Sequence, residues 1–130
     1  EWLGHTLAEV AAEKAGIKPI IGCEAYLAPG SMHERKDVQG RKRNSHLTLL
    51  AENNEGYANL VKLISKAHLE GMYSRPRVDK ATLEEHSKGL ICLSGCINGE
   101  INELLLTDRL DGEADAIDKV TAILVRGLGK

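Results

Sequence analysis

Three side chains with metal-binding chemistry stand at the borders of apolar runs. Glu24 follows the run 20–23, His46 precedes the run 47–50, and Cys96 comes shortly after another such run. In an α/β protein, strand ends gather ligand-binding groups, because the strand fixes the backbone while the side chain reaches open space. A carboxylate, an imidazole and a thiolate together suit zinc better than calcium or magnesium. These three residues are therefore candidate ligands.

The spacing of the three residues leaves other roles open. They lie 22 and 50 residues apart, unlike the close ligand pairs of zinc fingers. Glu24 could equally be a solvated charge, His46 a hydrogen-bonded histidine beside a loop, and Cys96 a small buried side chain. Residue types and spacing alone thus name candidates without establishing a metal.

Composition indicates one soluble domain of 130 residues, 42% apolar and 28% charged. The net charge of −2 argues against a strong attraction of the whole domain to nucleic acid, so any such contact needs a local patch. An odd number of cysteines and the lack of a signal peptide argue against a disulfide framework. No apolar run approaches the roughly 20 residues that span a bilayer. We therefore expect a cytoplasmic protein with no membrane partner.

Helical and strand patterns alternate along the chain. The first half predicts a helix that Gly16 ends, with Leu3, Leu7, Val10 and Ala11 on one face, and then a strand over 20–27 that is buried at its start. A long exposed loop over 29–45 and a strand over 47–51 follow.

The second half begins with a helix that Asn54 caps and that ends at Gly71. Its apolar stripe consists of Tyr57, Leu60, Val61, Ile64 and Ala67. A non-helical stretch over 75–77 and a short helix capped by Asp79 come next. After them we expect a purely apolar, central strand over 89–94, a helix around 101–105 and a last helix around 117–124.

This alternation predicts an α/β fold with parallel strands. Three predicted strands cannot close a barrel, so a barrel-shaped parent would receive less than half of its wall from this chain. We would then expect exposed apolar edges.

Further candidates have simpler explanations. The loop residues Arg41, Lys42 and Arg43 could touch a phosphate backbone, although charged runs in loops are usually only solvated. Arg75 and Arg77 flank a proline and are a second candidate for nucleic-acid contact, with a structural role as the alternative. Two remaining cysteines lie inside predicted strands, where core packing is expected, namely Cys23 and Cys92.

Several segments resemble one family in a single register. They are 15–24, 46–51, 54–57, 76–79 and 89–96, and they resemble the PHP (polymerase and histidinol phosphatase) domain that stands near the start of the bacterial DNA polymerase III alpha subunit. The chain is identified by this resemblance as the central part of such a domain, residues 1–130, truncated at both ends. The resemblance implies a distorted, TIM-like (βα)7 barrel that is incomplete in this chain.

The resemblance also implies a site. Metal ligands would be Glu24, His46 and Cys96, and the family's other ligands would lie outside this chain. The intact parent would hold a divalent metal, zinc above all, whereas the fragment would hold it weakly or not at all and would be inactive. The parent would be a DNA-directed DNA polymerase (a nucleotidyltransferase), and its PHP site a metal-dependent 3′–5′ exonuclease.

Partners implied by the resemblance are a DNA primer-template and other replisome subunits, both through the parent, while the oligomeric state stays open. One alternative is a non-catalytic PHP scaffold that stabilises the polymerase and binds partner subunits. Another is a free-standing PHP phosphatase acting on a small phosphate ester. The segments 54–57 and 76–79 resemble the polymerase branch rather than the phosphatases.

Overall fold

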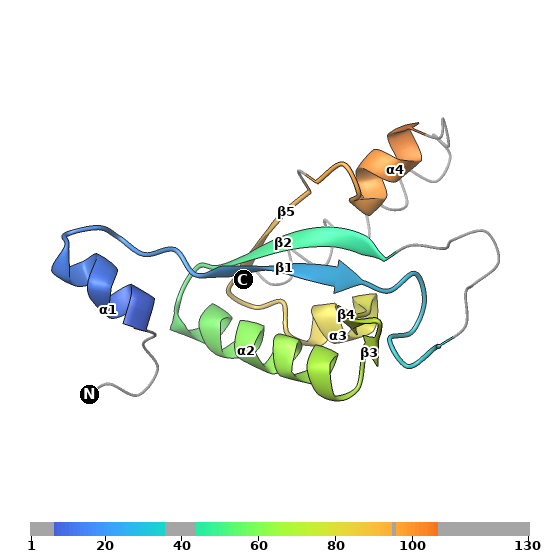
Figure 1. Ribbon diagram of the computed structural model, residues 1–130, viewed down its shortest axis with the longest axis horizontal. Helices are drawn as coiled ribbons and strands as arrows, with labels where there is room; N and C mark the ends of the chain where they lie inside the picture. The colour runs from blue at the N-terminus through green and yellow to red at the C-terminus, as the bar shows by residue number, and fades with distance from the viewer. Residues whose placement is uncertain (1–6, 36–43, 95, 107–130) are drawn as a thin grey trace.

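The computed structural model describes residues 7–35, 44–94 and 96–106 as a mixed α/β fold built on one sheet. The sheet has five strands in the order β3-β4-β1-β2-β5, and helix α2 runs along one of its faces (Figure 1). The elements are α1 (Leu7–Lys14), β1 (Gly22–Leu27), β2 (Ser45–Ala51), α2 (Asn54–Leu69), β3 (Met72–Tyr73), β4 (Arg75–Val78), α3 (Lys80–Glu85), β5 (Leu90–Leu93) and α4 (Glu100–Leu106).

Strand directions differ from the prediction of a parallel sheet. Strand β2 pairs antiparallel with both β1 and β5, and β3 pairs antiparallel with β4. Among the described strands, only β1 and β4 pair in parallel. Parallel neighbouring strands need a crossover connection, usually a helix. The sequence predicts no helix between β1 and β2, which agrees with their antiparallel pairing. The described strands form an open sheet, so the barrel stays a prediction.

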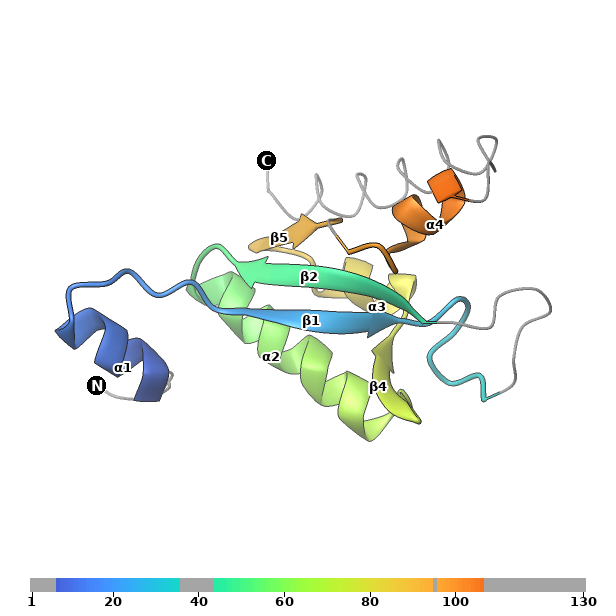
Figure 2. The same ribbon diagram turned by 45° about the horizontal axis from the view of Figure 1, so that its top comes forward.

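Helix α2 lies against the sheet (Figure 2), and apolar side chains of both form one buried core. Alternate residues of β2 point into this core, as the two-residue period of a strand requires. The inner face of α2 carries Leu63, which is fully buried, whereas the predicted Val61 is 49% exposed. The largest side chains that are essentially inaccessible to solvent come from four different elements: Leu49, Leu63, Leu90 and Val78.

Both ends of α2 lie close to the predicted positions. The cap is Asn53 rather than Asn54, since the Asn53 side chain accepts a hydrogen bond of 2.9 Å from the Gly56 N–H. The helix ends at Leu69 with Glu70 as its C-cap. The cap predicted for the short helix α3 is confirmed, because the side chain of Asp79 accepts a hydrogen bond from the Thr82 N–H.

Two strands are buried differently from the prediction. Strand β1 is buried toward its end rather than its start, with Ile20 before it 68% exposed and Leu27 4% exposed. The apolar strand β5 lies at one edge of the described sheet rather than at its centre. Its residues Ile91 and Leu93 are consequently 39% and 46% exposed. An apolar run therefore indicated strand structure correctly but not the position of the strand in the sheet.

Helix α1 stands apart from the sheet in both views (Figure 1 and Figure 2). Gly16, with φ of 71°, ends it as predicted, and the Ile17 N–H donates to the Ala12 carbonyl. No residue of α1 is buried, and Leu7 is 90% exposed, so its predicted apolar face has no cover in the described part of the chain. Leu3 and the helix predicted around 117–124 lie outside the described residues. None of the described helices is long and apolar enough to cross a membrane.

Candidate metal centre

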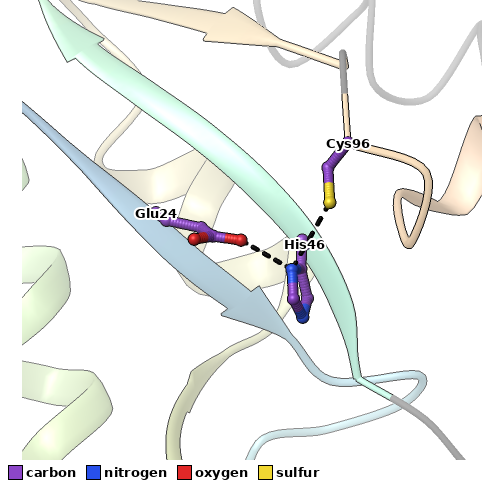
Figure 3. A group of neighbouring side chains, drawn as sticks. All are labelled: Glu24, His46 and Cys96. Atoms are coloured by element: carbon purple, nitrogen blue, oxygen red, sulfur yellow. Dashed lines mark hydrogen bonds and ion pairs between the residues drawn. The ribbon is translucent and has the colours of Figure 1, made fainter.

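Glu24, His46 and Cys96 converge on the face of the sheet that α2 leaves uncovered (Figure 3). The register of β1 and β2 explains how two of them meet. It pairs Glu24 with Thr48 and Tyr26 with His46, and directly paired residues of antiparallel strands point to the same face. Glu24 and His46 are thus diagonal neighbours on one face. The antiparallel pairing, which the sequence analysis missed, is what brings them together.

Cys96 reaches the same place from the turn that follows β5. Backbone hydrogen bonds fix this turn beside the start of β2, because the His46 N–H donates to the Asn98 carbonyl at 3.0 Å. The Gly99 N–H and the Asn102 side chain both donate to the Cys96 carbonyl, at 2.8 and 2.6 Å. The thiol is therefore held by its own turn and by the first turn of α4. Asn102 is a positioning residue that the sequence analysis did not identify.

Distances within the trio test whether it fits a metal. The His46 Nδ1 atom lies 2.6 Å from Glu24 Oε1 and 3.4 Å from Cys96 Sγ. All three ligand atoms lie within 4.8 Å of one another. Zinc bonds of about 2.0–2.3 Å in a tetrahedron separate ligand atoms by about 3.5 Å. The thiol and imidazole already have this spacing.

The contact between Glu24 and His46 is shorter than a shared ion requires. It is a charge-assisted hydrogen bond, and it would have to open by roughly 1 Å to admit zinc between the two groups. The Glu24 side chain is 53% exposed, so rotation of its carboxylate meets little resistance, whereas that of His46 is 24% exposed. The donor set of oxygen, nitrogen and sulfur fits a zinc-like ion.

Tyr26 and Arg75 form the surroundings of His46. The ring of Tyr26 packs edge-on against the imidazole with centroids 5.0 Å apart and an interplanar angle of 82°. The guanidinium of Arg75 lies 5.0 Å from the centre of the Tyr26 ring, and its Nη1 donates to the tyrosine hydroxyl at 2.9 Å. The sequence contained one signal for Tyr26, since it lies two residues after Glu24 and so on the same face of a strand.

The two arginines that flank Pro76 have different surroundings. Arg77 is 5% exposed, and its guanidinium donates to the carbonyls of Gly71, Met32 and Glu34 at 3.2, 2.9 and 2.9 Å. It holds the chain after β1 in place and is not available to nucleic acid, which corrects the prediction for this residue. Arg75 is exposed. The other predicted contacts, Arg41, Lys42 and Arg43, lie outside the described residues.

The two remaining cysteines pack against the core, as predicted. Burial raises the pKa of the Cys92 thiol to about 11. Burial, with a further contribution from the Glu24 carboxylate, also raises the pKa of Cys23. Both thiols therefore favour their neutral form, which suits apolar packing and not metal binding.

Comparison with known proteins shows the family of this chain. Residues 6–129 match the family model of the PHP domain, and the chain belongs to the PHP domain family.

The relatives named here are all alpha subunits of DNA polymerase III. The chain is 52% identical over 106 residues to the DNA polymerase III subunit alpha of Borreliella burgdorferi. This alignment covers 82% of this chain and 9% of that subunit. The subunit of Thermus aquaticus is 52% identical over 101 residues, 77% of this chain and 8% of that protein. The subunit of Helicobacter pylori is 49% identical over 96 residues, which are 74% of this chain and 8% of that subunit. The chain thus spans less than a tenth of each of these relatives.

Proposed function

We propose that this chain is the PHP portion of a DNA polymerase III alpha subunit and that Glu24, His46 and Cys96 bind a zinc-like divalent ion in it. One observation carries the metal site: three ligand atoms from three separate segments lie within 4.8 Å of one another. DNA synthesis, a primer-template, other replisome subunits and a cytoplasmic location belong to the longer protein in this proposal. The similarity to polymerase subunits supports them.

The proposed chemistry of the site is hydrolysis of a phosphodiester at a 3′ end. A bound ion supplies Lewis-acid stabilisation of charge on phosphoryl oxygens. Glu24, His46 and Cys96 would hold the ion, and the edge-on contact with Tyr26 orients the His46 ring. Zinc sites commonly have four ligands, so a further ligand would come from outside these three residues.

Three ligands do not hold the pair of ions that many phosphodiesterases use, which lie about 3.5–4 Å apart. We therefore propose the 3′–5′ exonuclease for the longer protein and expect the 130-residue chain to be inactive by itself. The comparisons do not favour the free-standing phosphatase, because each relative named above is a polymerase subunit. A scaffold would have the same relatives, and the convergence of the three ligand atoms is what favours the metal site over it.

Zinc titration of the 130-residue chain tests the site. Wild type is compared with His46→Gln and Cys96→Ser by competition against a chromophoric chelator. We expect wild type to bind one zinc weakly, because it supplies only three ligands. Each variant should lose at least about tenfold in affinity, since even residues that only orient a ligand contribute about 10- to 100-fold. Cobalt should give a sulfur-to-metal charge-transfer band in wild type that is absent from Cys96→Ser.

A matched control is His68→Gln, because His68 is an exposed histidine of α2, which packs on the other face of the sheet. It should bind zinc like wild type. Equal zinc affinity of wild type, His46→Gln and Cys96→Ser, with circular dichroism showing all three folded, would contradict the proposed site.

A further inference from the structure

Arg75 presents a positive charge beside the metal centre. Its guanidinium carbon and the imidazole centroid of His46 each lie 5.0 Å from the centre of the Tyr26 ring, so they are at most 10 Å apart. The hydrogen bond from Arg75 Nη1 to the Tyr26 hydroxyl fixes the guanidinium over the ring. A cation held in this way lies next to the place where the trio would hold its ion.

Arg75 is exposed and has donors left over after its hydrogen bond to Tyr26. A guanidinium carries five N–H donors, and the Tyr26 hydroxyl accepts from one nitrogen only. Within the part of the chain that the structure describes, Arg75 forms no ion pair with a carboxylate, although Glu24 lies on the same face of the sheet and pairs with His46 instead. An exposed arginine with a fixed orientation and unused donors is suited to an external anion.

The backbone under Arg75 is fixed as well. Strand β4 also contains Arg77, and Asp79 follows it directly; both residues are buried and hydrogen-bonded. On its other side, Ser74 has a φ of 60°, an uncommon conformation for a non-glycine residue, in the turn that pairs Tyr73 with Arg75. Arg75 therefore starts from a rigid position, so its side chain loses less freedom on binding a ligand than a loop arginine would.

We propose that Arg75 binds a phosphate group next to the metal centre, with Tyr26 as the residue that positions its guanidinium. The inference rests on the proposed function, because it supplies the phosphate contact for the same site. The planar fork of arginine matches two phosphate oxygens at once. The phosphate belongs either to a nucleic-acid strand or to a free nucleoside monophosphate, and both present the same oxygens.

Calorimetric titration of the zinc-bound 130-residue chain tests the proposal. The probes are thymidine monophosphate, a thymidine dinucleotide with one phosphodiester, and thymidine, which has no phosphate. We expect Arg75→Gln to weaken binding of the phosphate probes about tenfold, the range of one charge-assisted hydrogen bond. Arg75→Lys and Tyr26→Phe should each weaken it less, about threefold. Lys62→Gln removes an exposed charge from α2 and should leave it unchanged.

Zinc affinity, measured separately, distinguishes the possible failures. If wild type binds no zinc, the proposed metal centre is refuted. If wild type binds zinc but no phosphate probe, or if Arg75→Gln binds the probes like wild type, the phosphate site is refuted alone. A loss of zinc affinity in Arg75→Gln with unchanged phosphate binding would also overturn it, by making Arg75 a support for His46. Tighter binding of the dinucleotide supports a strand as the source, and tighter binding of the monophosphate supports a nucleotide.

Discussion

Replacing Asp79 with alanine should remove three hydrogen bonds, two local ones from Thr82 and one from the distant Met32. Its carboxylate accepts from the Thr82 N–H at 2.8 Å and from the Thr82 hydroxyl at 2.7 Å, which caps helix α3. The other carboxylate oxygen accepts from the Met32 N–H at 3.0 Å. Asp79 is 8% exposed and Met32 4% exposed, so water cannot easily replace these bonds. The expected result is a large loss of stability.

The magnitude follows from the separate bonds. Loss of the cap costs about 0.5–2 kcal/mol. A buried Met32 N–H without an acceptor costs about 1–3 kcal/mol. We therefore expect Asp79→Ala to lower the free energy of unfolding by about 2–4 kcal/mol. At an unfolding entropy of about 2.1 cal/mol/K per residue, that corresponds to a fall in Tm of roughly 7–15 °C.

Acidity gives a second test of the same residue. Burial alone would raise the pKa of Asp79, but the hydrogen bonds from Thr82 and Met32, and then the charge of His33, hold this pKa below its ordinary value. The carboxylate therefore contributes stability above the unfolded pKa of about 3.9, and the contribution is lost as the pH falls through the folded pKa. An Asp79→Asn variant keeps a capping oxygen but no charge, so its deficit relative to wild type should shrink between pH 6 and pH 3.

Urea unfolding followed by circular dichroism measures both effects. The control is Glu52→Ala, which removes an exposed carboxylate and should change the free energy of unfolding by less than about 0.5 kcal/mol. A change for Asp79→Ala as small as that of the control would refute the role assigned to the carboxylate. A deficit of Asp79→Asn that stays constant from pH 6 to pH 3 would refute the lowered pKa.

Two further predictions concern packing and thiol reactivity. Gly56→Ala should lower the free energy of unfolding by more than about 2 kcal/mol in urea, because an added Cβ would clash with the Gly89 carbonyl oxygen. Ser65→Ala, at an exposed position of the same helix, should cost nothing, and equal stabilities of the two variants would contradict the close approach. At pH 8, iodoacetamide should alkylate Cys92 far more slowly than Cys96, because a pKa of about 11 leaves only about one thiol in a thousand ionised. Zinc should protect Cys96, and equal rates for the two thiols without zinc would refute the difference.

Local signals in the sequence predicted most of the elements. Gly16 ends α1 and Asp79 caps α3 as expected, because stop and cap signals act through the backbone within a few residues. The strands around Cys23, His46 and Cys92 were also found, although β3 and β4 were not. Pro76 indicated only that its stretch is not helical.

Position within the fold was harder to predict. Apolar character did not place β5 at the edge of the described sheet, since an apolar run is compatible with several positions. The inner stripe of α2 was predicted correctly at Leu60 and Ala67, whereas Leu63 lies inside and Val61 outside. Periodicity leaves a helix free to rotate by part of a turn, and the neighbouring strands decide the final orientation.

The sequence by itself determined the chemistry available to this protein: a carboxylate, an imidazole and a thiol at Glu24, His46 and Cys96, and basic groups at Arg75 and Arg77. Only the tertiary structure decided how these groups are used. Antiparallel pairing makes Glu24 and His46 neighbours, the turn after β5 adds Cys96, and burial separates the structural Arg77 from the exposed Arg75. These relations depend on contacts between residues far apart in the chain, which local propensity and periodicity do not encode.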